Sequence, residues 1–282
     1  MTAAYTTGVL LCAALGTATA ASQTFTSRVE AVRVDVLVTV DGQPFKGLGA
    51  DDFEVRDNGV LQKVNLVSFE EIPLNVVLAL DMSGSVTAEG LEHLQRAGET
   101  LLAGLEPRDR AALLTFSHVV TQRSGLTGDI AQLRVALASV KPRGDTALID
   151  AAQAAMIVAG STSSRGLVVI FSDGLDTSSW LSRDLVLATA RRSDAVVYAI
   201  AVGRSSDDFL DNLTDLTGGR LLRAETTTTV RALFVQVLEE FRHRYLISYT
   251  PAGVERGGWH RLQVRVRRPN AIVRARPGYT AR

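Results

Sequence analysis

The chain has 282 residues, of which 46% are hydrophobic, and 30 basic and 30 acidic residues give it a formal net charge of zero. This length and hydrophobic content suit two modest globular domains and carry no signature of disorder. The balanced charge gives no indication of a nucleic-acid-binding protein, for which a basic excess is expected.

Residues 1–21 are predicted to be a secretion signal. Gly8 to Leu15 forms a short apolar core, and Ala18-Thr19-Ala20 has the small-x-small pattern of a cleavage site, although no Lys or Arg precedes the core. The apolar run is too short to span a bilayer. The only cysteine, Cys12, lies in this segment, so the mature chain would contain no disulfide bond. We therefore expect a secreted or periplasmic protein with a cleaved signal peptide and no transmembrane segment.

The next segment, residues 22–72, has the pattern of antiparallel β-structure. Valine occupies every even position from 32 to 40, which predicts a half-buried strand. Asp41-Gly42 indicates a turn, and Asp57-Asn58-Gly59 after a short apolar run indicates a β-hairpin. Residues 64–69 would continue the sheet. These strands are too few to bury a core by themselves.

A polar loop follows the first strongly apolar run of the chain. Leu74 to Leu80 is typical of a strand buried on both faces, and Asp81-Met82-Ser83-Gly84-Ser85 comes directly after it. Open α/β sheets bind ligands at the carboxyl ends of their strands. Oxygen ligands at this point suit a hard cation, Mg²⁺ first, with Mn²⁺ or Ca²⁺ possible. Taken alone, the same residues fit turn chemistry or a helix cap equally well.

Two later segments favour the metal site. Gly144-Asp145-Thr146 precedes an apolar-periodic helix predicted over residues 147–159. Residues 167–171 form a second apolar strand, which runs into Ser172-Asp173-Gly174. Three oxygen-bearing loops therefore follow one another in the order expected for a shared site.

With these residues the chain resembles the von Willebrand factor type A domain, whose metal-ion-dependent adhesion site combines Asp-x-Ser-x-Ser with a distant Thr and a distant Asp-Gly. The matching residues are Asp81, Ser83, Ser85, Thr146 and Asp173. The resemblance implies that the three hydroxyl groups bind the metal directly, while the two aspartates act mostly through bound water and neighbouring hydroxyls. It also implies an open coordination position, which an Asp or Glu side chain of a protein partner fills.

The region around these loops alternates between helices and strands, as a doubly wound, mostly parallel α/β sheet requires. We expect this α/β domain to cover residues 73–243. Its further predicted elements are helices over 91–105, 185–192, 209–216 and 229–242, strands over 110–117 and 195–202, and an antiparallel edge strand over 118–122.

The last segment, residues 244–282, returns to period-two alternation over 245–250, 262–267 and 272–275. We expect residues 22–72 and 244–282 to fold together into one small β-sandwich into which the α/β domain is inserted, because neighbouring chain ends tolerate insertions. This layout resembles exported bacterial proteins related to von Willebrand factor A. They share a lead-in like residues 47–53 and an ending like Pro277-Gly278-Tyr279.

The leading functional hypothesis is a non-enzymatic, divalent-cation-dependent adhesion or scaffold module that binds a protein partner. A structural envelope protein stabilised by its metal is one alternative. A metal-assisted phosphoester hydrolase is less favoured, because haloacid-dehalogenase-like enzymes need a second aspartate where Ser83 stands. The four histidines are scattered without the spacing of a metal site and are predicted to be ordinary surface or satisfied core residues: His93, His118, His243 and His260.

Overall fold

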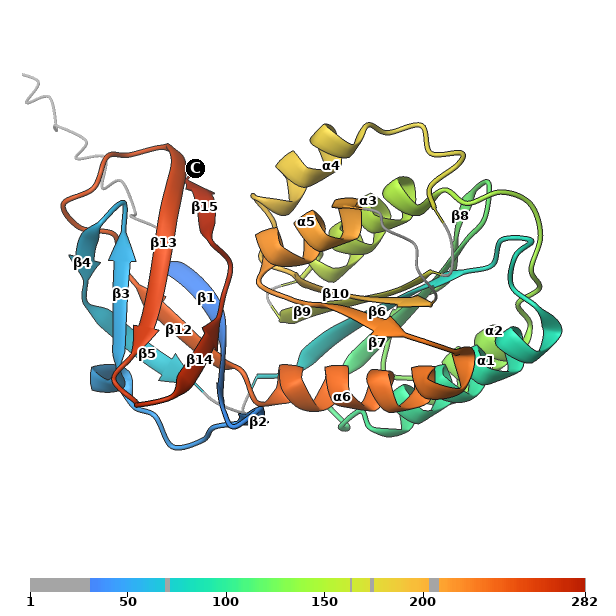
Figure 1. Cartoon of the computed structure of the whole chain (residues 1–282), viewed down its shortest axis with the longest axis horizontal. Helices are drawn as coiled ribbons and strands as arrows, with labels where there is room; N and C mark the ends of the chain where they lie inside the picture. The colour runs from blue at the N-terminus through green and yellow to red at the C-terminus, as the bar shows by residue number, and fades with distance from the viewer. Residues whose placement is uncertain (1–30, 69–71, 163, 173–174, 203–207, 282) are drawn as a thin grey trace, which may run out of the picture.

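The computed structural model describes residues 31–68, 72–162, 164–172, 175–202 and 208–281. In Figure 1 an α/β unit lies on the right and a pair of antiparallel sheets on the left. The predicted signal over residues 1–21 lies outside the described residues, as do Phe69 and Asp173. Within the described ranges, no helix combines the length and the apolar character that crossing a membrane requires.

The α/β unit is built on a six-stranded sheet in the order β11-β10-β9-β6-β7-β8. Five strands are parallel, and β8 runs antiparallel at the edge, as predicted. Every residue of the central strands β6 and β9 is buried, which agrees with their continuous apolar sequences. The strands are β6 (Leu74–Asp81), β7 (Arg110–Phe116), β8 (Val120–Thr127), β9 (Arg165–Ser172), β10 (Val196–Val202) and β11 (Leu221–Ala224).

Helices cover both faces of this sheet (Figure 1) and bury one apolar cluster on each. On α6, the side chains of Val230, Phe234, Val237 and Phe241 are buried at the spacing that the sequence predicted. One face carries α1 (Ala88–Ala103), α2 (Ile130–Ala138) and α6 (Val230–Arg242), and the other carries α3 (Leu148–Ala159), α4 (Arg183–Ala190) and α5 (Asp208–Thr217); a short 3-10 helix, η2 (Thr227–Thr229), precedes α6.

The N- and C-terminal segments together form the two antiparallel sheets, which confirms the predicted insertion of the α/β unit. One sheet has the order β14-β1-β12-β5, with β2 paired to β1, and the other has the order β15-β13-β3-β4. Their apolar faces share one core cluster, so the pair is a β-sandwich. Its elements are β1 (Val32–Val40), β2 (Gln43–Pro44), η1 (Ala50–Asp52), β3 (Phe53–Asp57), β4 (Val60–Gln62), β5 (Val64–Ser68), β12 (Tyr245–Tyr249), β13 (Gly258–Val266), β14 (Ala271–Arg274) and β15 (Gly278–Ala281).

Two ion pairs, one of them largely buried, join the sandwich to the amino-terminal ends of the parallel strands. The guanidinium group of Arg165, at the start of β9, donates to Asp35 of β1, with 2.8 Å between Nε and Oδ1. Arg276, which follows β14, donates from a terminal nitrogen to Asp194 at 2.8 Å. Because the sandwich occupies this end of the sheet, the carboxyl ends of the strands face away from it (Figure 1).

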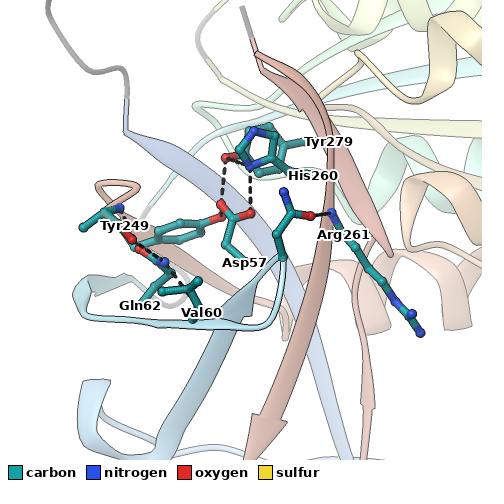
Figure 2. Close-up of polar contacts among 9 residues, drawn as sticks. Asp57, Val60, Gln62, Tyr249, His260, Arg261 and Tyr279 are labelled. Carbon is teal, nitrogen blue, oxygen red and sulfur yellow. Dashed lines mark hydrogen bonds and ion pairs between the residues drawn. The ribbon is translucent and has the colours of Figure 1, made fainter. Parts of the chain in front are cut away.

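A buried carboxylate ties the two sheets of the sandwich together (Figure 2). Asp57 is completely buried, and its oxygens accept three hydrogen bonds. The donors are Nδ1 of His260 at 2.7 Å, the hydroxyl of Tyr249 at 2.9 Å and the hydroxyl of Tyr279 at 2.8 Å. Tyr249 belongs to the first sheet and the other three residues to the second. We call these four residues the Asp57 cluster.

We expect the Asp57 cluster to make the stability of the protein sensitive to alkaline pH. Burial, together with the hydrogen bond to Asp57, raises the pKa of Tyr279 to about 12 and raises the pKa of Tyr249 still further. Unfolded tyrosine loses its proton near pH 10, so the stabilisation is complete below about pH 10 and is lost as the pH rises toward 12. We expect the melting temperature, followed by circular dichroism, to fall between pH 9.5 and 11.5. In the double variant Tyr249→Phe/Tyr279→Phe, the melting temperature should fall less steeply over that pH interval. Equal slopes for the two proteins would contradict this origin.

Candidate metal centre

The candidate site lies where the strand order of the α/β sheet reverses. Strand β7, which follows β6 in the chain, pairs with one edge of β6. Strand β9 pairs with the other edge, where Leu80 lies opposite Phe171. Asp81 ends β6 and Ser172 ends β9, so two polar side chains meet at this switch point. Ligands of open α/β sheets bind at such a point.

Asp81 is the buried anchor of the site. It is completely buried, and each of its oxygens accepts a hydrogen bond. Oδ1 accepts from the backbone N–H of Ser83 at 2.9 Å, and Oδ2 accepts from the hydroxyl of Ser172 at 2.7 Å. These bonds fix the first turn of the loop and leave a negative charge directly behind the hydroxyl groups. The sequence analysis did not single out Ser172; its position at the end of the strand beside β6 is the signal that identifies it.

Ser83 and Ser85 carry the site from the buried Asp81 toward the surface. Their hydroxyl oxygens lie 2.9 Å apart, with Ser83 buried and Ser85 exposed. An octahedral Mg²⁺ with bonds of 2.0–2.1 Å places neighbouring ligands about 2.9 Å apart. The spacing of the two hydroxyls therefore fits two adjacent positions on a magnesium ion.

The loop that carries Thr146 packs against the first loop through its backbone. The N–H of Arg143 donates to the carbonyl of Met82, and the N–H of Gly84 donates to the carbonyl of Gly144, both at 2.8 Å. Gly144 has a φ of +76°, and a Cβ there would lie 2.7 Å from Nδ1 of His118, so only glycine fits. Thr146 itself is buried beside this contact.

A third loop, between β9 and α4, is fixed to the same edge. Thr146 accepts a bond at its carbonyl from the N–H of Thr177 at 2.8 Å and donates from its own N–H to the Thr177 hydroxyl at 3.0 Å. Asp150, in the first turn of α3, accepts bonds from the N–H groups of Trp180 and Leu181 at 3.0 and 2.9 Å. Both contacts fix the shape of the rim around the site.

The structure thus joins Asp81, Ser83 and Ser85 by direct bonds and holds the backbone of Thr146 against the same loop. Asp173, the fifth predicted residue, lies outside the described residues. Over the described ranges, no group of three or more His, Cys, Asp and Glu side chains has the arrangement of a metal site.

Comparison with known families and curated proteins agrees with this architecture. A model of the von Willebrand factor type A domain matches residues 75–236. Inter-alpha-trypsin inhibitor heavy chain H2 from Sus scrofa is 22% identical over 208 residues, which cover 66% of this chain and 22% of that protein. The same protein from Mus musculus is 23% identical over the same shares. The chain spans about a fifth of the length of these relatives.

Two solved structures share the fold. A von Willebrand factor type A protein from Catenulispora acidiphila aligns with a TM-score of 0.57 at 12% identity, over 90% of this chain and 75% of that one. Proximal thread matrix protein 1 of the mussel byssus, in a structure with a zinc-occupied MIDAS motif, aligns with a TM-score of 0.57 at 16% identity. That alignment covers 66% of this chain and 49% of the mussel chain. At these identities the comparison shows a common fold.

Proposed function

The chain belongs to the von Willebrand factor type A domain family, and we propose that it is a divalent-cation-dependent protein-binding module that acts outside the cytoplasm. In this proposal Ser83, Ser85 and Thr146 bind Mg²⁺ directly. Asp81 and Asp173 support the ion through bound water and neighbouring hydroxyls. A Glu or Asp side chain of another protein then takes the remaining coordination position.

The observation that carries this proposal is the 2.9 Å hydroxyl pair of Ser83 and Ser85 in front of the buried Asp81 carboxylate. Neutral hydroxyl ligands leave most of the positive charge of the ion unbalanced, so an acidic group from outside is attracted to it. The zinc-occupied motif of the mussel protein supports a divalent ion at this place in the fold. Oxygen ligands favour Mg²⁺ over zinc here.

We further propose that different segments of the chain have different roles. Residues 73–243 form the metal-binding domain, and residues 22–72 and 244–282 form a sandwich that carries it, after removal of a signal at residues 1–21. The sandwich contacts the amino-terminal ends of the strands through Arg165 and Asp35. This arrangement supports a role of the sandwich in presenting the metal edge, because that edge faces away from the sandwich.

Magnesium binding and partner capture test the proposal together. Titration calorimetry of the purified protein should show Mg²⁺ binding, and Ser83→Ala should weaken it about tenfold, because one ligand is replaced by water. Capture of a protein from an envelope extract should require Mg²⁺, disappear in EDTA and decrease with Ser83→Ala. The matched control is Ser139→Ala, at an exposed serine that follows α2.

Two results would contradict the protein-binding function. One is the absence of Mg²⁺ or Mn²⁺ binding with unchanged capture by Ser83→Ala. The other is chelation that lowers the melting temperature but leaves capture intact, which would identify a structural metal.

A further inference from the structure

A second candidate site lies between the sandwich and the α/β unit, away from the metal loops. A cavity of about 850 Å³ is lined by the start of β1, by the residues that follow α4, by the loop between β12 and β13, and by β15. Small-molecule sites occupy about 300 to 1,000 Å³ and often lie where two folded units meet. The cavity therefore has the size and position of a ligand site.

The lining of this cavity is basic. Asp194 and Glu255 contribute two carboxylates, and Asp194 is already paired with Arg276 at 2.8 Å. Against these stand five arginines, an excess of three positive charges. Guanidinium groups match carboxylate and phosphate oxygens through paired hydrogen bonds. The five are Arg33, Arg191, Arg192, Arg256 and Arg276.

A buried histidine in the same lining lacks a partner on one side. His260 is 1% exposed, and Asp57 holds its Nδ1 at 2.7 Å (Figure 2). Its Nε2 is buried, and no described residue bonds to it. The Nε of Arg276, another lining residue, is also buried without a partner among the described residues. Buried polar groups are nearly always hydrogen-bonded, so His260 and Arg276, both in the cavity lining, each keep one polar atom unsatisfied among the described residues.

We propose that this cavity binds a small anionic molecule through a phosphate or carboxylate group, held by the guanidinium groups of the arginines that line it. Arg191 and Arg192 come from the α/β unit and His260 from the sandwich, so the ligand bridges the two parts and stabilises their arrangement.

Calorimetry with two probes, inorganic phosphate and citrate, tests this proposal. Chloride at equal ionic strength serves as the reference, and no divalent cation is added. We expect saturable binding of at least one probe and a higher melting temperature in its presence. If only phosphate binds, the site takes a phosphate group. If only citrate binds, it takes a carboxylate group. If both bind, the arginines recognise either anionic group.

Exposed arginines provide variants that should fold normally. The double variant Arg191→Gln/Arg192→Gln should lower the affinity for the probe about tenfold or more, because charge-assisted hydrogen bonds are lost. Arg134→Gln/Arg231→Gln removes the same charge from exposed positions on α2 and α6 and should leave affinity unchanged. Ser83→Ala should also bind the probe normally, which separates this site from the metal centre. Absence of binding by both probes, or equal weakening by the two double variants, would overturn the proposal.

Discussion

Replacing Asp57 with leucine is expected to lower the free energy of unfolding by about 3–5 kcal/mol, the cost of removing one member of a buried charged network. Leucine has a similar size but accepts no hydrogen bond. The hydroxyls of Tyr249 and Tyr279 and the Nδ1 of His260 would each remain buried without their acceptor. Urea denaturation followed by circular dichroism measures the loss.

Asparagine at the same position separates lost hydrogen bonds from lost charge. Its amide oxygen can accept from both tyrosines, and a change of tautomer lets Nδ1 of His260 accept from the amide NH₂. Asp57→Asn should therefore cost clearly less than Asp57→Leu. Asp51→Leu, at an exposed position in η1, is the matched surface control and should change stability by less than about 0.5 kcal/mol. If Asp57→Leu behaves like Asp51→Leu, the cluster does not stabilise the sandwich.

Features of the fold that depend on local sequence were predictable. The hairpin at Asn58-Gly59 forms with φ values of 47° and 85°, as a two-residue turn of this type requires. The alternating valines form β1 with the expected register toward the core. Both signals act between neighbours in the chain, so one sequence is enough to detect them.

Helix α2 and the strands β11 and β15 escaped the sequence analysis because their local signals are weak. The helix α2 has only nine residues, and its Val135 is 71% exposed, which blurs the apolar periodicity. The strands β11 and β15 have four residues each. They form because β10 and β13 offer open edges to pair with, and that requirement arises only in the assembled sheets.

At the candidate sites, the contacts that one sequence could not predict join residues that are far apart in the chain. Asp81 and Ser172 are 91 positions apart, and Asp57 and His260 are 203 positions apart. The sequence analysis grouped His260 with ordinary surface or satisfied core histidines. The structure makes it a buried core histidine whose Nδ1 is bonded to Asp57, while its Nε2 has no partner among the described residues.

Replacing Asp81 with asparagine is expected to weaken Mg²⁺ binding about 10-fold to 100-fold, the range found when a group that supports metal ligands is lost. The amide oxygen can still accept from the N–H of Ser83, and the NH₂ can donate to the hydroxyl of Ser172, so the loop keeps its shape. The change therefore removes the buried charge while preserving the positions of the hydroxyls. Calorimetric titration with Mg²⁺ gives the affinity.

The control for this variant is Asp145→Asn, which removes an exposed carboxylate from the residue just before Thr146. Solvent screens that charge, so its loss should change Mg²⁺ affinity only slightly. Without metal, Asp81→Asn should melt at or above the temperature of the wild-type protein, because a buried charge no longer has to be desolvated. A lower melting temperature in the absence of metal would instead make Asp81 a structural residue. Equal losses of affinity from the two variants would show that general negative charge, rather than the carboxylate behind Ser83, holds the ion.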